Sequence, residues 1–159
     1  MNIRPFRKDD FDTLWRIDQA CFDPELAYSR IELAVYMRRP ASFTLIAEEA
    51  EHADRGAARI VGFVVAESRR KIGHIITIDV VAESRRSGVG SRLLDAAEER
   101  LHRSGVTEVA LETPVNNVAA TRFYKIKGYF VEKTVPGYYS NRLDAFLMRK
   151  DLAPLEEDD

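Results

Sequence analysis

One strand-to-helix junction constrains this chain more than any other feature of its sequence. The run HIITIDVV, residues 74–81, is rich in β-branched residues and predicts a buried strand, whereas SRLLDAAEERL, residues 91–101, repeats its apolar residues at helical spacing. The link AESRRSGVG, residues 82–90, supplies two glycines and two arginines. Such a bend aims backbone N–H groups at one point, and the dipole of the following helix favours negative charge there. The sequence therefore predicts an anion site, suited to a pyrophosphate, over Arg85 to Ser91.

Four segments carry apolar residues at helical spacing, and three of them follow a residue that can cap a helix. The candidate caps are Asp9 or Asp10, Ser29 with Glu32 in capping-box order, and Asn116 or Asn117. Gly105 and Gly128 follow the last two segments, as expected of helix ends. The helix before Gly105 has Leu93 and Leu101 on its apolar face and Glu98 on the opposite face. These helices are expected at residues 11–21, 29–39, 91–103 and 117–127.

Six runs of β-branched, aromatic or alternating residues predict strands. The first two are separated by EHADRGAAR, residues 51–59, a polar link without periodicity, and therefore predict a hairpin with a long loop. The six strands are expected at residues 42–50, 60–68, 73–82, 107–115, 129–135 and 144–152. This order of elements predicts a mixed α/β sheet with helices on its faces.

The chain has 159 residues, enough for one domain with a hydrophobic core. We expect a single domain over residues 1–152 and an acidic tail, residues 153–159, that frays. A net charge of −2 gives no general attraction to nucleic acid or to an anionic membrane, and no apolar run nears the roughly 18 residues of a membrane span. A cytoplasmic protein without nucleic acid or membrane as partner is expected.

Cysteine and histidine usage gives no sign of a disulfide or a metal site. Cys21 is the only cysteine, which excludes an intramolecular disulfide. His52, His74 and His102 lack metal-ligand spacing, so we expect no metal and assign them solvated or packing roles.

Two other phosphate-binding motifs fit the glycine-rich link less well. A Walker loop needs Lys followed by Ser or Thr after its last glycine, but Ser91 and Arg92 follow Gly90. A dinucleotide fingerprint needs a third glycine, and Leu93 stands there. A glycine turn that merely caps a solvated basic helix stays open as the structural alternative.

The segment IDVVAESRRSGVGSRLL, followed by VALETPVNNVAATRFYKIKGY, resembles the Gcn5-related N-acetyltransferase (GNAT) family. The resemblance follows the order of elements along nearly the whole chain, and its motifs lie within residues 76–130. It implies a six- to seven-stranded, mostly antiparallel sheet flanked by about four helices, with acetyl-CoA as cosubstrate. Ala82 departs from the pattern, because many members have proline there.

The resemblance also implies a set of coenzyme-binding residues. The pyrophosphate would bind N–H groups of the glycine-rich link, the pantetheine arm would pair with the backbone of one strand like an extra strand, and an asparagine would bond its amide. The residues so assigned are Ile78, Val80, Arg85, Arg86, Ser87, Gly88, Val89, Gly90, Ser91 and Asn117.

Acetyl transfer to an amine requires a base, a donor for the carbonyl oxygen and a proton for the leaving thiolate. Glu112 is the candidate base, because a carboxylate in a central strand is costly without a partner or a task. Its structural alternative is an ion pair with an arginine. Tyr124 is the candidate general acid, with a core tyrosine as the alternative. The resemblance assigns the oxyanion to the N–H of Val80 or to one adjacent to it. Cys21 is expected to be a buried structural thiol, which favours direct transfer.

Local features are similar to protein N-α-acetyltransferases that modify ribosomal proteins: CFDPELAYS, ALETPVNNVAATRFYKIKGY and GYYSNRLDAFLM. This similarity implies a free protein or peptide N-terminus as acceptor. The predicted peptide-binding residues are Phe22, Leu26, Tyr28, Tyr138 and Tyr139. The alternatives are loop aromatics that only cover the core, an acetyltransferase for small amines such as polyamines, amino acids or aminoglycosides, and a non-catalytic acyl-CoA sensor. A monomer or a homodimer is expected.

Overall fold

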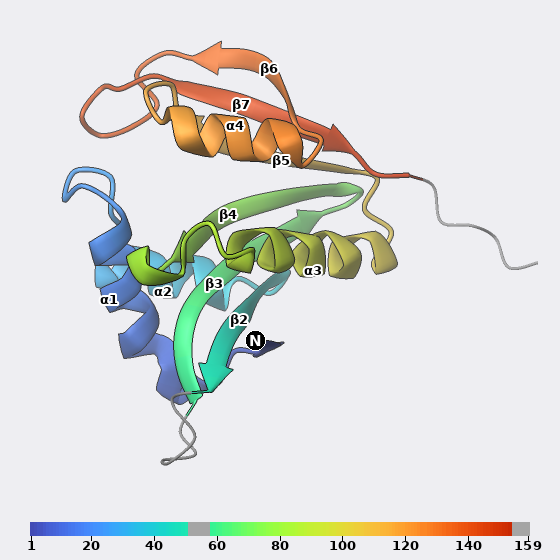
Figure 1. Ribbon diagram of the computed structural model, residues 1–159. Helices are drawn as coiled ribbons and strands as arrows, with labels where there is room; N and C mark the ends of the chain where they lie inside the picture. Colours follow the sequence, from blue (N-terminus) through green and yellow to red (C-terminus); the bar gives the residue numbers. More distant parts are fainter. Residues whose placement is uncertain (51–57, 154–159) are drawn as a thin grey trace, which may run out of the picture.

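The computed structural model describes residues 1–50 and 58–153 (Figure 1). Its strands are β1 (Asn2–Pro5), β2 (Ser42–Ala50), β3 (Ala58–Arg69), β4 (Ile72–Val80), β5 (Glu108–Pro114), β6 (Phe130–Val135) and β7 (Ala145–Asp151). Its α-helices are α1 (Phe11–Cys21), α2 (Arg30–Arg38), α3 (Val89–Arg103) and α4 (Val118–Ile126). Short 3₁₀ turns cover Lys8–Asp10 and Ala82–Ser84. Over these described ranges, no helix combines the length and apolar character that a bilayer crossing requires.

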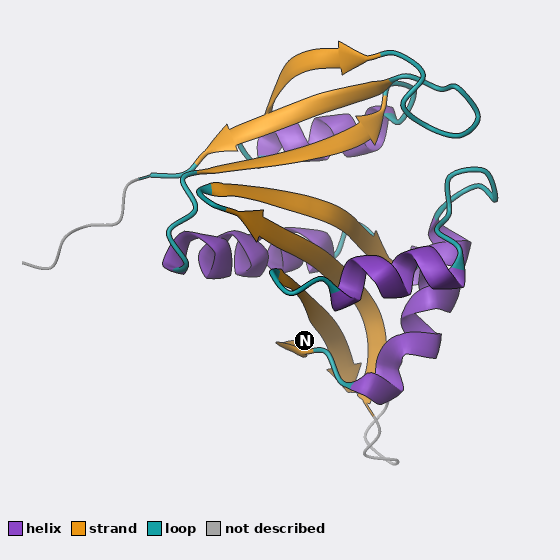
Figure 2. Cartoon of the chain, turned by 180° about the vertical axis from the view of Figure 1, so that it is seen from behind, coloured by secondary structure: helices purple, strands orange, loops and turns teal. Residues whose placement is uncertain are grey.

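The strands form one sheet in the order β1-β2-β3-β4-β5-β7-β6. All neighbours are antiparallel except β4 and β5. Helices α3 and α4 cover one face of the sheet, and α1 and α2 cover the other face of its first half (Figures 1 and 2). The expected mixed, mostly antiparallel α/β fold with four flanking helices is confirmed.

The two halves of the sheet diverge between β4 and β5. These strands pair only where Ile72, Gly73 and His74 face 108–110, after which they separate like the arms of a V (Figure 2). A β-bulge at Ile76 bends β4 at the start of the divergence, because the residues on either side of it pair with adjacent residues of β3. From Ile75 onward, the edge of β4 that faces β5 lies along an opening rather than along a partner strand.

Two apolar clusters form the core, and the larger one also includes residues of β5 and β7. On one face, α3 buries Leu93, Leu94, Ala97 and Leu101 against the strands. On the other face, Leu14 and Ile17 of α1 pack on Ile46, Phe63 and Val65. The apolar face of α3 lies where its sequence period predicts.

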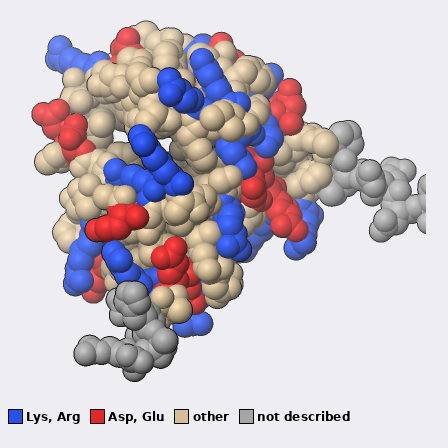
Figure 3. All heavy atoms as spheres, viewed as in Figure 1, with Lys and Arg blue, Asp and Glu red and all other residues tan. Residues whose placement is uncertain are grey.

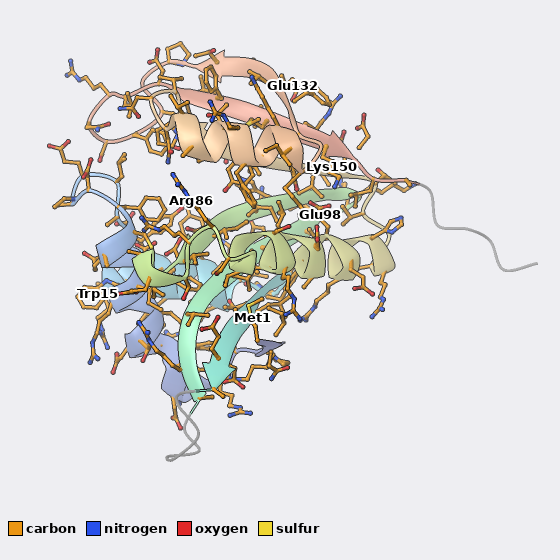
Figure 4. All side chains as sticks on the ribbon, in the orientation of Figure 1. Met1, Trp15, Arg86, Glu98, Glu132 and Lys150 are labelled. Atoms are coloured by element: carbon orange, nitrogen blue, oxygen red, sulfur yellow. The ribbon has the colours of Figure 1, made fainter. Side chains whose placement is uncertain are left out.

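Glu98 lies in a buried position, contrary to its expected place on the polar face of α3. The Tyr129 hydroxyl donates to Oε2 of Glu98 at 2.9 Å, and Lys150 Nζ donates to Oε1 at 2.6 Å. In Figure 4, Lys150 reaches from β7 toward Glu98 across the space between the two halves of the sheet. The carboxylate therefore connects α3 to the second half, and its partners come from residues far away in sequence.

Several other boundaries differ from the sequence-based expectation. β1 was not predicted, because a four-residue strand that ends in proline carries no readable alternation. Asp10 does not cap α1 through its side chain, which instead accepts from the Arg7 N–H and pairs with Arg4. Helix α3 begins at Val89, two residues earlier than expected. His52 and the tail residues 154–159 lie outside the described residues.

Candidate active site

The divergence of β4 from β5 opens two connected cavities. A cavity of about 150 Å³ lies among β4, β5, the loop after α1 and the loop before β7. A larger cavity of about 560 Å³ lies among β4, the start of α3, and α4. They share the lining residues Phe22, Ile78, Asn117, Ala120 and Tyr124. A ligand in the larger cavity can therefore extend into the smaller one.

The larger cavity offers an anion site at the start of α3. The first hydrogen bond of the helix runs from the Arg92 N–H to Gly88 O, at 3.1 Å. The N–H groups of residues 89–91 come before it and do not take part in the hydrogen bonds of the helix. The first turn contains no acidic side chain. Gly88 has a φ of +87°, and the space where a Cβ would lie is open. Because glycine has no side chain there, a ligand can approach the backbone closely. These features fit a pyrophosphate.

Basic side chains border this cavity (Figure 3). Arg86 reaches from the loop before α3 into the space below α4 (Figure 4). The Arg85 guanidinium is held at the end of β4, where its Nε donates to Val80 O at 3.1 Å. Arg92 instead donates to Met1 O at 3.2 Å and lines neither of the two cavities.

Eight of the ten residues expected at the coenzyme line the larger cavity: Ile78, Val80, Arg85, Arg86, Gly88, Gly90, Ser91 and Asn117. Ser87 and Val89 do not. The Ser87 hydroxyl bonds Ser84 O, and the Val89 side chain is buried in the core. These two residues can contribute only their backbone.

The edge of β4 presents backbone groups to the opening. Val81 N–H donates to Val61 O of β3 at 2.9 Å, and successive N–H groups alternate along a strand, so the N–H of Val80 points to the opposite side, toward the opening. On that side Val80 O accepts from the Cys21 thiol at 3.4 Å, besides Arg85. The Val80 N–H therefore points into the opening, on the wall of the larger cavity.

Glu112 lies in the smaller cavity and is paired with a histidine. His74 Nε2 lies 2.6 Å from Glu112 Oε2. On the other side of the imidazole, Nδ1 lies 3.9 Å from Glu67, which also pairs with Arg39 at 3.0 Å. Sequence reasoning assigned His74 a solvated or packing role and missed this contact. The register of β4 with β3 and β5 creates it, and no local pattern reports that register.

Tyr124 lies half-buried on α4 and lines both cavities. Burial raises the pKa of its phenol, with a smaller contribution from the charge of Asp79, so the hydroxyl stays protonated. Asn117 caps α4, since its Oδ1 accepts from the Ala120 N–H at 3.1 Å. This cap sets where α4 begins and therefore where Tyr124 lies.

All five residues predicted to bind the acceptor line the smaller cavity: Phe22, Leu26, Tyr28, Tyr138 and Tyr139. Ser140 Oγ donates to Glu25 O at 2.7 Å and joins the two loops that carry these residues. The Tyr138 and Tyr139 rings meet edge to face, with centroids 4.9 Å apart. The two loops therefore bring the five side chains together around one slot.

A buried carboxyl pair beneath the slot was not foreseen from the sequence. Asp18 of α1 and Asp79 of β4 are 0% and 1% exposed. The Tyr28 N–H donates to Asp18 at 2.9 Å, and the Thr77 hydroxyl donates to Asp79 at 2.5 Å. Burial raises the pKa of both groups. The adjacent Asp18 raises that of Asp79 further, whereas the contact with Asp79 lowers that of Asp18, so the pair retains a proton on Asp79.

Cys21 lines the larger cavity and is half-buried. Burial raises the pKa of its thiol, with a smaller contribution from the charge of Asp79. A thiol in this state is a weak nucleophile.

The comparison with known proteins agrees with this geometry. The model of the acetyltransferase (GNAT) family matches residues 11–129. The chain is 32% identical to an uncharacterized N-acetyltransferase of Methanocaldococcus jannaschii, over 94% of this chain and 91% of that protein. It is 29% identical to an N-alpha-acetyltransferase of Caenorhabditis elegans, over 99% of this chain and 86% of that protein. The crystal structure of Ard1 from Thermoplasma volcanium superimposes with a TM-score of 0.81 at 27% identity, over 96% of this chain and 97% of that chain.

The fold, the anion site at the start of α3 and these relatives agree with one another. The family uses acetyl-CoA as the acyl donor, and the anion site beside Gly88 fits that coenzyme. The chain belongs to the GNAT family and is an acyl-CoA-dependent N-acetyltransferase.

Proposed function

We propose that this protein acetylates the free α-amino group of a protein or peptide N-terminus, with Glu112 as the base. The observation that carries this proposal is the Glu112–His74 pair at the inner end of an aromatic slot that opens into the coenzyme cavity. The names of relatives from Caenorhabditis elegans and Saccharolobus solfataricus, both N-alpha-acetyltransferases, support this class of acceptor.

Acetyl-CoA supplies the acetyl group as a reactive thioester when it is bound. The N–H groups at the start of α3, with Arg85 and Arg86, hold its pyrophosphate. The open edge of β4 at Ile78 and Val80 aligns the pantetheine arm, and the free amide nitrogen of the Asn117 side chain donates to it. These contacts orient the donor along β4 toward the slot.

Glu112 removes the proton from the amine. A protein α-amine has a pKa of about 7.7–8.0, so most of it is protonated at neutral pH and cannot attack. With the proton on Nε2, His74 donates to Oε2 of Glu112, orients the carboxylate and leaves Oε1 to face the amine. His74 is therefore a positioning residue, and Glu67 and Arg39 hold the far side of its ring.

The N–H of Val80 donates to the acetyl oxygen as negative charge develops there. The Tyr124 hydroxyl donates to the leaving sulfur. A phenol has a higher pKa than a thiol, and burial raises that of Tyr124 further. Tyr124 therefore stabilises the leaving sulfur through its hydrogen bond, and the proton that the sulfur takes from it is replaced by the proton that the acylated nitrogen releases. Cys21, with its raised pKa, takes no part, and transfer is direct.

Mass spectrometry of acetyl transfer to a mixed set of acceptors tests this function. The set contains peptides that differ in their first two residues, matched peptides with a blocked N-terminus and an internal lysine, and polyamines. Acetylation confined to free N-termini and lost in Glu112→Gln supports the proposal. Labelling of polyamines alone would contradict it and identify a small-amine enzyme. Coenzyme binding without any transfer would instead indicate a sensor.

A further inference from the structure

Lys127 is a cation on the wall of the coenzyme cavity with no assigned role. It follows α4 directly, and its side chain is 16% exposed. Its Nζ lies 2.8 Å from Ser91 Oγ and 2.6 Å from Asp95 Oδ1. Because Ser91 lies in the first turn of α3, the ammonium group lies beside the N–H groups proposed to bind the pyrophosphate.

The position of this ammonium group is electrostatically unusual. The N-terminus of a helix already carries a partial positive charge, so a lysine there is disfavoured. Arg85 and Arg86 line the same cavity and add two further positive charges. Asp95 provides the compensating negative charge, but its side chain is 58% exposed and can turn into solvent at little cost.

The backbone of Lys127 is fixed independently of its side chain. Its N–H donates to Phe123 O at 3.1 Å at the end of α4, and Gly128 follows with a φ of +97°. The chain therefore directs this side chain toward the start of α3 without help from the ammonium group. A lysine that only packed the end of α4 against α3 would not need its ammonium group at this place.

We propose that Lys127 is a phosphate-binding residue of the coenzyme site. In the free enzyme Asp95 pairs with the ammonium group, and on binding a phosphate oxygen of the coenzyme replaces Asp95. Ser91 can keep its contact with Lys127, since a hydroxyl can accept from the ammonium while it donates to a phosphate. The inference rests on the proposed coenzyme residues and adds a third cation to them.

Isothermal titration with coenzyme A tests this role without relying on turnover. Lys127→Met is expected to weaken binding about tenfold, the loss expected for one charge-assisted hydrogen bond. Lys127→Arg should retain most of the affinity. Asp95→Asn should tighten binding about two- to fivefold, because it removes the competing carboxylate of an exposed ion pair. Lys125→Met, on the exposed side of α4, is the matched control and should bind as the wild type does.

Two further measurements distinguish a contact of Lys127 with the coenzyme from a purely structural contact between α4 and α3. The slope of log Kd against log salt concentration should fall in Lys127→Met, since one charge contact is lost. A titration with 3′-dephospho-coenzyme A locates the contact: a tenfold loss that persists indicates the pyrophosphate, and a loss that disappears indicates the 3′-phosphate. Either result supports the proposal.

An unchanged Kd in Lys127→Met and Asp95→Asn overturns the inference, even if both variants melt at lower temperature. In that case Arg85→Ala still reports on the proposed coenzyme site: weakened binding there keeps that site and removes only Lys127 from it. Failure of the wild-type protein to bind coenzyme A would remove the site itself.

Discussion

Nε2 of His74 lies 2.6 Å from Oε2 of Glu112, at the point where the pairing of β4 and β5 ends. His74 is the last residue of β4 that pairs with β5, opposite Ala110, and Glu112 stands two residues further along β5. The contact therefore spans the point where the two halves of the sheet separate. This side-chain hydrogen bond joins the two strands where their backbone ladder ends.

We expect Glu112→Gln to lower kcat by about 10²- to 10³-fold at neutral pH and to leave the Kd for coenzyme A unchanged. The amide keeps the shape and can still accept from His74 but cannot take a proton. The deficit should shrink above about pH 8, because a growing share of the α-amine is then already neutral. A pH–rate profile of both proteins with one peptide acceptor measures this.

His74→Gln is the companion variant. If His74 only positions Glu112, the variant should lose about tenfold in kcat and keep the shape of the pH profile. A full-rate Glu112→Gln enzyme would show that Glu112 is not the base.

Tyr124→Phe is expected to slow the chemical step by roughly 10- to 100-fold with little change in coenzyme affinity. The ring packs on Phe123 and Tyr129, with centroids 5.2 Å and 5.9 Å away, and phenylalanine preserves those contacts. Single-turnover kinetics separates the transfer step from product release. A wild-type rate in that assay would assign the sulfur's proton to water.

Local patterns predicted those parts of the molecule that short-range physics determines. The capping box at Ser29, the cap of α4 at Asn117 and the glycine ends of α3 and α4 depend on residues within one or two turns, and each lies where the sequence indicates. The bend before α3 belongs to the same class, because its positive φ at Gly88 follows from a local glycine.

The unpredicted polar contacts of the site and of Glu98 depend on residues far apart in sequence. His74 and Glu112 are 38 residues apart, and Glu98 and Lys150 are 52 apart. The Asp18–Asp79 pair requires α1 to cross β4, which no local pattern reports. In each case the sequence indicated a solvated position for the polar side chain or gave no position for it. Its partners come from the register of the strands or from the packing of the helices.

Gly62→Ala is expected to destabilise the fold by about 1–3 kcal/mol. A Cβ at this position would lie 2.7 Å from the backbone oxygen of Asp79, and a backbone atom cannot move aside as a side chain can. Urea denaturation measures the change. Gly90→Ala is the control, since its Cβ would meet nothing nearer than 3.7 Å, and alanine favours a helix. Equal stability of the two variants would contradict this explanation.

Asp79→Asn is expected to raise the melting temperature by a few degrees at about pH 7.5 and by less toward about pH 4. Burial beside Asp18 raises the pKa of Asp79, so the folded protein binds this proton more tightly than the unfolded chain. Stability is then complete below the unfolded pKa of about 3.9, where both states are protonated, and declines as the pH rises toward the folded pKa. Asparagine resembles the protonated acid and removes this decline.

Differential scanning fluorimetry of both proteins from about pH 4 to about pH 8 measures the effect. The amide introduced by Asp79→Asn can still accept from the Thr77 hydroxyl through its oxygen and can donate to Asp18 through its nitrogen, so the geometry is retained. The double variant with Asp18→Asn is the control. It should lose the gain, because no carboxylate remains to accept from the introduced amide. A difference between Asp79→Asn and the wild type that stays constant over this range would show that the pair does not hold a proton.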